Sequence, residues 1–282
     1  MKLKKKSWFN MQSKRFVKKF KNKKNKYNVL IYPKLFKSNK KFIKICFECN
    51  VKSNTFPILK IVSTNREEIG NVMANSTSIV DISNIKNYFV SIYVPEECDF
   101  VINKLEIDLY DSDEEFFNCF KSDILIVTPS YPSIDNKYQC AFVHSRLKEY
   151  KKAGLDVDVI SCYDYKGISK YTFEDVDVIK ANYYYLRKLL NIKKYKKILV
   201  HFFDENYANV FDSVDLTKTN LYLYLHGAEV LYREYSKFAQ PYFKNEEIES
   251  PNKYLFERKD NIFKKYNELK NVKWIFVSEI VK

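Results

Sequence analysis

From residue 122 onward, short apolar runs alternate with stretches of helical periodicity, and this alternation limits the possible folds more than any other feature of the sequence. Residues 122–128 and 155–160 read as buried strands, and residues 138–152 between them read as a helix that ends at Gly154. The pattern continues with expected strands at 176–180, 197–203, 221–225 and 272–277 and expected helices at 183–194, 205–211, 229–238 and 254–269. Such alternation predicts an α/β domain with a parallel sheet covered by helices on both faces.

Residues 27–118 have a different rhythm, with short apolar runs separated by Asn, Ser and Pro clusters and no long helical pattern. Apolar and polar residues alternate in KFIKICF (41–47) and in KLEIDLY (104–110). We expect strands at 27–32, 42–49, 57–62, 88–94 and 101–110, and therefore a small all-β, sandwich-like domain. Strand aromatics such as Tyr88 or Tyr93 would bind glycans if exposed, but strand aromatics usually pack in cores. We therefore expect this domain to act as a spacer or as a surface that faces a membrane.

The positive charge of the chain is concentrated at its N-terminus. Residues 1–44 hold 17 lysines and arginines and no acidic residue, whereas the rest of the chain holds 32 basic and 35 acidic residues. Residues 1–26 place Trp and Phe among the lysines at roughly helical spacing. This leader is either a basic amphipathic segment that adsorbs to an anionic membrane through Lys4, Lys5, Lys6, Trp8 and Phe9, or a disordered, solvated lysine-rich leader. Nucleic-acid binding is not expected, because the charge is not organised on a folded face.

Several site classes lack their sequence signals. No apolar run reaches the roughly 18 residues of a membrane span, and the N-terminus lacks the apolar core of a secretory signal, so we expect a cytoplasmic protein, peripheral on the inner membrane face if the leader binds lipid. Cys46 and Cys49 have the spacing of half a zinc site, but no second pair completes it, and we predict no metal. With four glycines in all, the chain has no glycine-rich nucleotide loop.

The segment HGAE at 226–229 follows an expected strand and precedes an expected helix. In open parallel sheets ligands bind beyond the carboxyl ends of the strands, so His226 stands where a functional side chain would be placed. The alternative is a histidine that only caps the loop. His144 is expected to pack within its helix, whereas His201, at the end of an expected strand, either lies in the core or borders the cleft.

The ordered set of these motifs resembles glycosyltransferase family 4. Residues 124–132 read ILIVTPSYP, 141–146 read AFVHSR and 153–159 read AGLDVDV, which is similar to the opening of that family. Residues 198–203 (ILVHFF), 225–229 (LHGAE) and 275–279 (IFVSE) are similar to later landmarks in the same order. The resemblance covers residues 122–282 and leaves residues 1–121 unassigned.

The resemblance implies a GT-B fold in which residues 122–282 form the Rossmann-like, acceptor-side domain of a retaining enzyme. Such an enzyme would transfer a sugar from a nucleotide sugar to a cell-surface polysaccharide or glycolipid acceptor without a cofactor. It further implies that His226 is catalytic and that substrate is bound by Tyr131, Tyr138, Gly227, Glu229 and Ser278. One departure is Cys140, which stands where the family usually has glycine.

A second departure is that the sequence stops at Lys282, before the domain that holds the nucleotide sugar in the family. We therefore expect residues 1–282 alone to show no sugar-nucleotide-dependent transfer, because the leaving diphosphate must be stabilised by positive charge or helix dipoles. The competing hypothesis is a non-catalytic glycan- or membrane-binding protein with a degenerate α/β domain.

Overall fold

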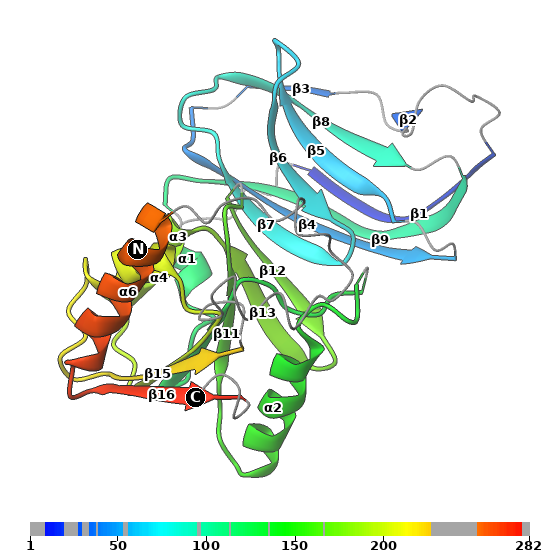
Figure 1. Cartoon of the computed structure of the whole chain (residues 1–282). Helices are drawn as coiled ribbons and strands as arrows, with labels where there is room; N and C mark the ends of the chain where they lie inside the picture. Colours follow the sequence, from blue (N-terminus) through cyan, green and yellow to red (C-terminus); the bar gives the residue numbers. More distant parts are fainter. Residues whose placement is uncertain are drawn as a thin grey trace, which may run out of the picture. The chain divides into compact units, whose positions relative to one another are not determined.

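The computed structural model describes residues 9–19, 28–29, 34–37, 39–52, 56–94, 97–112, 114–134, 136–165, 167–226 and 253–277. The chain divides into two compact units. Unit 1 consists of Met1–Lys121, Pro132–Gln139 and Tyr163–Asn182, and unit 2 of Ser122–Tyr131, Cys140–Cys162 and Tyr183–Lys282. The protein has mixed α/β structure (Figure 1). Unit 1 is built mainly from antiparallel strands, and unit 2 is built from parallel strands and helices.

Unit 1 contains two antiparallel sheets. The first runs β1 (Phe9–Lys19), β9 (Glu97–Tyr110), β4 (Phe42–Val51), β7 (Ser76–Asp81), β12 (Ile168–Phe173) and β13 (Val176–Ala181). The second runs β2 (Asn28–Val29), β8 (Asn87–Val94), β5 (Ile58–Ser63) and β6 (Glu68–Met73), with β3 (Lys34–Lys37) also paired to β8. The short helix α1 (Glu114–Phe117) follows the last residues of β9 in the sequence.

The two sheets of unit 1 share one hydrophobic core. In β4 the alternation of the sequence places Ile43, Ile45 and Phe47 inward, each with no exposed surface. Leu59 and Ile61 of β5 and other apolar residues of the second sheet belong to the same core cluster. Burying a side chain of this size stabilises the fold by roughly 1.5–3 kcal/mol, so the period-2 pattern decides which face of each strand packs inward.

Two segments differ from the sequence prediction. Phe9–Lys19, for which the pattern favoured an amphipathic helix or a disordered leader, is strand β1, paired antiparallel with β9. Residues 176–180, expected in the parallel sheet, form β13, which pairs antiparallel with β12 in a hairpin of unit 1. The hairpin turn at Glu174 and Asp175 has positive φ at both residues, which is the two-residue geometry that matches strand twist.

Unit 2 contains a parallel sheet in the order β11 (Asp158–Cys162), β10 (Ile124–Thr128), β14 (Lys197–His201), β15 (Asn220–Leu225) and β16 (Val272–Phe276). Counted along the chain within this unit, the order is 2-1-3-4-5, the order of doubly wound sheets. In such sheets the ligand site lies beyond the carboxyl ends of the strands, next to the point where the order reverses. Here that point lies between β10 and β14.

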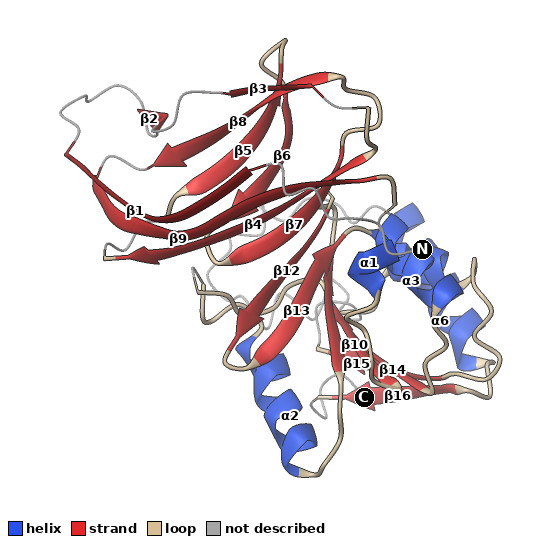
Figure 2. Ribbon diagram, turned by 180° about the vertical axis from the view of Figure 1, so that it is seen from behind, coloured by secondary structure: helices blue, strands red, loops and turns tan. Residues whose placement is uncertain are grey.

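Helices lie on both faces of this sheet. Helix α2 (Ala141–Lys152) is on one face, and α3 (Tyr183–Ile192), α4 (Glu205–Phe211) and α6 (Lys253–Asn267) are on the other (Figures 1 and 2). After Lys152, the last residue of α2, and the C-cap Ala153 comes Gly154, whose φ is 77°. The Gly154 N–H donates to the Lys151 carbonyl and the Leu155 N–H to the Tyr150 carbonyl, a Schellman motif. Helix α4 begins at Asp204, whose carboxylate accepts the N–H of Tyr207 at 3.0 Å.

Across the ranges given above, no helix is both long enough and apolar enough to pass through a membrane.

Candidate functional site

The carboxyl ends of β14 and β15 bring two histidines together. His201 is the last residue of β14, and His226 directly follows β15. His201 Nδ1 and His226 Nε2 are 3.0 Å apart, a hydrogen bond whose donor depends on the tautomers. His201 is fully buried and stacks on Tyr224, with ring centroids 4.5 Å apart and an interplanar angle of 20°. Strand register therefore sets this pair, since neighbouring parallel strands end at the same edge of the sheet.

Helix α2 supplies three further side chains at a spacing of four residues, Phe142, Arg146 and Tyr150, which therefore share one helix face. The Phe142 ring centroid is 4.7 Å from that of His226. The Arg146 guanidinium lies 5.0 Å from the Tyr224 ring centroid, and the Tyr150 and Tyr224 hydroxyl oxygens are 3.0 Å apart. We call the set that meets here the histidine cluster; its members are Phe142, Arg146, His201, Phe202, Tyr224 and His226.

Two residues at this edge have left-handed backbone conformations. Phe202, with φ of 59°, stacks on His226 at a centroid distance of 4.4 Å. Cys140, at the N-cap of α2, has φ of 50° and ψ of 37°. Non-glycine residues in this region cost about 1–2 kcal/mol, and such strain gathers at functional sites. The geometry also explains why a glycine would suit position 140, where the resemblance led us to expect one.

The cluster keeps both imidazoles neutral. Burial, followed by the electrostatic effects of the neighbouring His226 and Arg146, lowers the pKa of His201 to about 3. Burial, followed by Arg146, lowers the pKa of His226 to about 4. At neutral pH the cluster therefore presents one positive charge, on Arg146, beside two uncharged imidazoles that either donate or accept hydrogen bonds. Burial and the hydrogen bond with Tyr150 raise the pKa of Tyr224, so its hydroxyl also stays protonated.

Two buried polar atoms in the cluster have no hydrogen-bond partner among the described residues, His201 Nε2 and Arg146 Nη1. Leaving a buried polar atom unpaired costs about 1–3 kcal/mol, and more for a charged group, so such atoms call for an explanation. A bound polar ligand is one. In the described ranges, no three His, Cys, Asp or Glu side chains are grouped so as to hold a metal ion.

The effect of Arg146 on the histidines can be measured directly. We expect Arg146→Met to raise the pKa of His226, because the variant removes a positive charge that disfavours the imidazolium. An NMR titration of the imidazole carbon-bound protons measures this shift, and only three histidines need assignment. Lys148→Met, which removes an exposed charge from the same helix, is the control. An unchanged His226 pKa in Arg146→Met would contradict the geometry of the cluster.

The structure places the residues expected to bind substrate in different environments. Tyr131 is buried in unit 2, and its hydroxyl is 2.7 Å from His144 Nδ1, a contact that anchors the loop after β10. Tyr138 belongs to the Pro132–Gln139 segment of unit 1 and is 91% exposed. Gly227, Glu229 and Ser278 lie outside the described residues, as does the helix expected at 229–238.

Expectations for the N-terminal part of the chain can also be located. Lys4, Lys5, Lys6 and Trp8 lie outside the described residues, and Phe9 is the first residue of β1. Tyr88 is fully buried in the core of unit 1 and cannot present its ring to a glycan. Tyr93 is half-buried, with the Lys60 ammonium 5.1 Å from its ring centroid.

Sequence reasoning missed most of the histidine cluster. Phe142 and Arg146 were part of the AFVHSR motif but had no assigned role, although their spacing of four residues on a helix was visible. The position of His201 was left open between core and cleft. Phe202 gave no signal, because a left-handed conformation at phenylalanine is not encoded by any local pattern.

Comparisons with known proteins do not define a family. No family model and no curated protein matches the chain. The Gap123 glycosylation-associated protein complex from Streptococcus agalactiae is 11% identical over 84% of this chain and 71% of that one, with a TM-score of 0.25. The salicylyl-acyltransferase SsfX3 from a tetracycline biosynthetic pathway is 10% identical over 84% and 67%, with a TM-score of 0.30. A family two carbohydrate esterase from Cellvibrio japonicus is 8% identical over 95% and 89%, with a TM-score of 0.26. Similarities at this level carry no argument about fold or function.

Proposed function

We propose that unit 2 is the acceptor-binding half of a glycosyltransferase, with the nucleotide sugar held by a separate donor-binding domain. The observation that carries the proposal is the convergence of His226, His201 and Arg146 at the carboxyl edge of the parallel sheet, with two buried polar atoms left unpaired. A doubly wound sheet binds its ligand at this edge. The ordered motifs that resemble glycosyltransferase family 4 supply the reaction class.

The cluster has the chemistry that an acceptor sugar requires. Phe142 is 40% exposed and provides an apolar ring surface for the carbon-bound hydrogens of a pyranose. His226, with a pKa of about 4, is neutral at physiological pH and hydrogen-bonds a sugar hydroxyl as donor or acceptor. Holding that hydroxyl close to the anomeric carbon of the donor is the largest contribution this half can make, because orientation alone removes several kcal/mol from the barrier.

The positive charge of Arg146 favours an acceptor that carries a negative charge. Its guanidinium is the charged group of the cluster, and charge-assisted hydrogen bonds to phosphate or carboxylate are about twice as strong as neutral ones. We therefore propose an acceptor that carries an anionic group near the reacting sugar, such as a glycolipid phosphate or an acidic polysaccharide. The cytoplasmic face of a membrane, reached through the leader with Lys4, Lys5, Lys6 and Trp8, is the proposed place of reaction.

A glycan array that includes acidic and phosphate-bearing saccharides tests this proposal with the purified chain. We expect a subset of anionic glycans to bind, and His226→Ala and Phe142→Ala each to weaken that binding at least about fivefold while unfolding stays cooperative, since loss of one desolvated contact is worth about 1–3 kcal/mol. Tyr184→Ala is the matched control, because Tyr184 is an exposed aromatic residue on α3. The proposal fails if no glycan binds, or if both cluster variants bind as the wild type does.

A further inference from the structure

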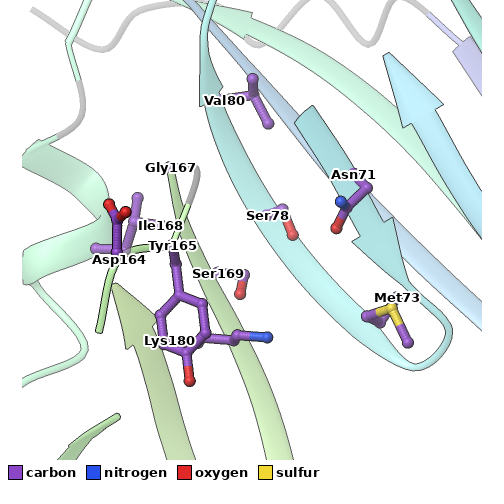
Figure 3. Close-up of a pocket in the computed structure, with 10 residues that line it drawn as sticks. All are labelled: Asn71, Met73, Ser78, Val80, Asp164, Tyr165, Gly167, Ile168, Ser169 and Lys180. Carbon is purple, nitrogen blue, oxygen red and sulfur yellow. The ribbon is translucent and has the colours of Figure 1, made fainter. Parts of the chain in front are cut away.

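Unit 1 contains a cavity of about 190 Å³ that the sequence analysis did not anticipate (Figure 3). Its wall combines residues of β6 and β7 with residues of β12, β13 and the segment before β12. The volume is below the roughly 300–1,000 Å³ of sites for drug-sized molecules. A ligand here would therefore be about one ring with its substituents.

A row of polar side chains crosses three neighbouring strands along one wall. Ser169 of β12 is paired with Ser78 of β7 on one side and with Lys180 of β13 on the other. Directly paired residues point to the same face of a sheet, so all three side chains face the cavity, as its lining confirms (Figure 3). The hydroxyls of Ser78 and Ser169 and the ammonium of Lys180 thus form a continuous polar surface.

The cavity begins where the second sheet of unit 1 ends. Strand β6 is the edge of that sheet, and its Gly70 lies so close to Val80 that a Cβ atom at Gly70 would be 2.8 Å from Val80 Cγ1. Ser78 lies two residues before Val80 on the same face of β7. Asn71 and Met73, which alternate along β6 with the buried Gly70 and Val72, also line the cavity. The cavity therefore adjoins the tightly packed contact between Gly70 and Val80.

Ser78 is the observation that points to a ligand. The residue is 2% exposed, and its Oγ is buried with no hydrogen-bond partner among the described residues. In a sheet face whose neighbouring position is Val80, an alanine or valine would avoid the cost of burying an unpaired hydroxyl. A ligand hydroxyl in the cavity would satisfy this oxygen.

The charges in the wall indicate a neutral ligand. Lys180 contributes one ammonium group, which lies 4.2 Å from the Tyr165 ring centroid, and Asp164 contributes one carboxylate. Their formal charges cancel, while Ser78, Ser169 and Asn71 add donors and acceptors. We infer that this cavity binds a neutral monosaccharide unit, as a free sugar or as the end of a glycan. The site lies within unit 1 and is independent of the proposed acceptor site.

NMR titration of the full chain with neutral hexoses and N-acetylhexosamines tests the inference, with amide shifts followed at Ser78, Ser169 and Lys180. We expect saturable binding that Ser78→Ala weakens about fivefold and Lys180→Met about 25-fold, since a charge-assisted hydrogen bond is about twice as strong in free energy as a neutral one. Because Ser78 Oγ has no partner before the ligand binds, Ser78→Ala should not lower the midpoint of chemical unfolding.

Lys170→Met is the matched control, because Lys170 follows Ser169 on the opposite face of β12 and pairs with Asp177 at 2.5 Å. It should bind as the wild type does. Three results would overturn the inference: no shift at these amides with any neutral sugar, wild-type affinity in both Ser78→Ala and Lys180→Met, or tighter binding of glucuronate or a sugar phosphate than of the neutral sugars. The acceptor site is tested with other variants, His226→Ala and Phe142→Ala, and with anionic glycans. Either proposal can therefore fail while the other holds.

Discussion

Phe203→Ala should lower the free energy of unfolding by about 3–5 kcal/mol, the cost of removing a large aromatic side chain from a packed core. Phe203 is 1% exposed and follows β14 by two residues. Its ring is 4.9 Å from that of Tyr266, 6.0 Å from Trp274 and 6.4 Å from Phe211, measured between centroids. One side chain thus joins α4, α6 and β16, and the cavity left by alanine would have aromatic walls too rigid to collapse.

The neighbouring residue gives a sharp control. Phe202 is half-buried and its ring faces His226, so Phe202→Ala should cost about 1 kcal/mol in stability but should weaken glycan binding. Urea unfolding followed by circular dichroism measures both stabilities. Equal losses in the free energy of unfolding for the two variants would contradict the placement of Phe203 in the core and of Phe202 beside His226.

Acidification from pH 7 to pH 5 should remove about 2 kcal/mol of stability through His201 alone. The pKa of His201 is lowered to about 3 in the folded protein, against 6.5 for an unperturbed histidine. Between these values the unfolded chain binds a proton that the folded chain does not. The stabilising contribution is therefore fully present above about pH 6.5 and is lost as the pH falls toward the folded pKa. His226, whose pKa is also lowered, acts in the same direction.

His201→Phe isolates this effect, because phenylalanine keeps a ring to stack on Tyr224 and cannot titrate. Unfolding free energies are measured from urea titrations at pH 7, 6 and 5. Between pH 7 and pH 5 the wild type should lose about 2 kcal/mol more than His201→Phe does. Aspartates and glutamates contribute equally to both proteins, so they cancel in the comparison. Parallel pH curves for the wild type and the variant would contradict a buried, neutral His201.

Much of the secondary structure was readable from the sequence. The predicted helix at 205–211 is α4, with Asp204 as its cap, and the predicted strands at 42–49 and 221–225 correspond to β4 and β15. In β4 the alternating residues Ile43, Ile45 and Phe47 are the buried ones. These segments were predictable because the local sequence pattern of each one favours the same structure as its packing does. The pattern is a period of two in a strand and an N-cap before a helix.

The rest depended on pairing between distant segments. Strands β6, β7 and β12 carry polar residues such as Asn71, Ser78 and Ser169, some of which line the cavity, so their apolar signal was too weak to predict them. For β1, the lysine-rich pattern indicated a solvated leader or an amphipathic helix, whereas pairing with β9 holds it as a strand. The histidine cluster was foreseen only at His226, because strand register and the face of α2 bring its other members together.

NMR shift mapping with a glycan selected from the array tests the central claim most directly, that the carboxyl edge of the parallel sheet in unit 2 is the acceptor site. We expect the largest amide shifts at Phe142, Arg146, His201, Phe202 and His226, together with a change in the imidazole resonances of His226. Saturable glycan binding that leaves all of these signals unmoved would contradict the account, whatever else in the chain responds.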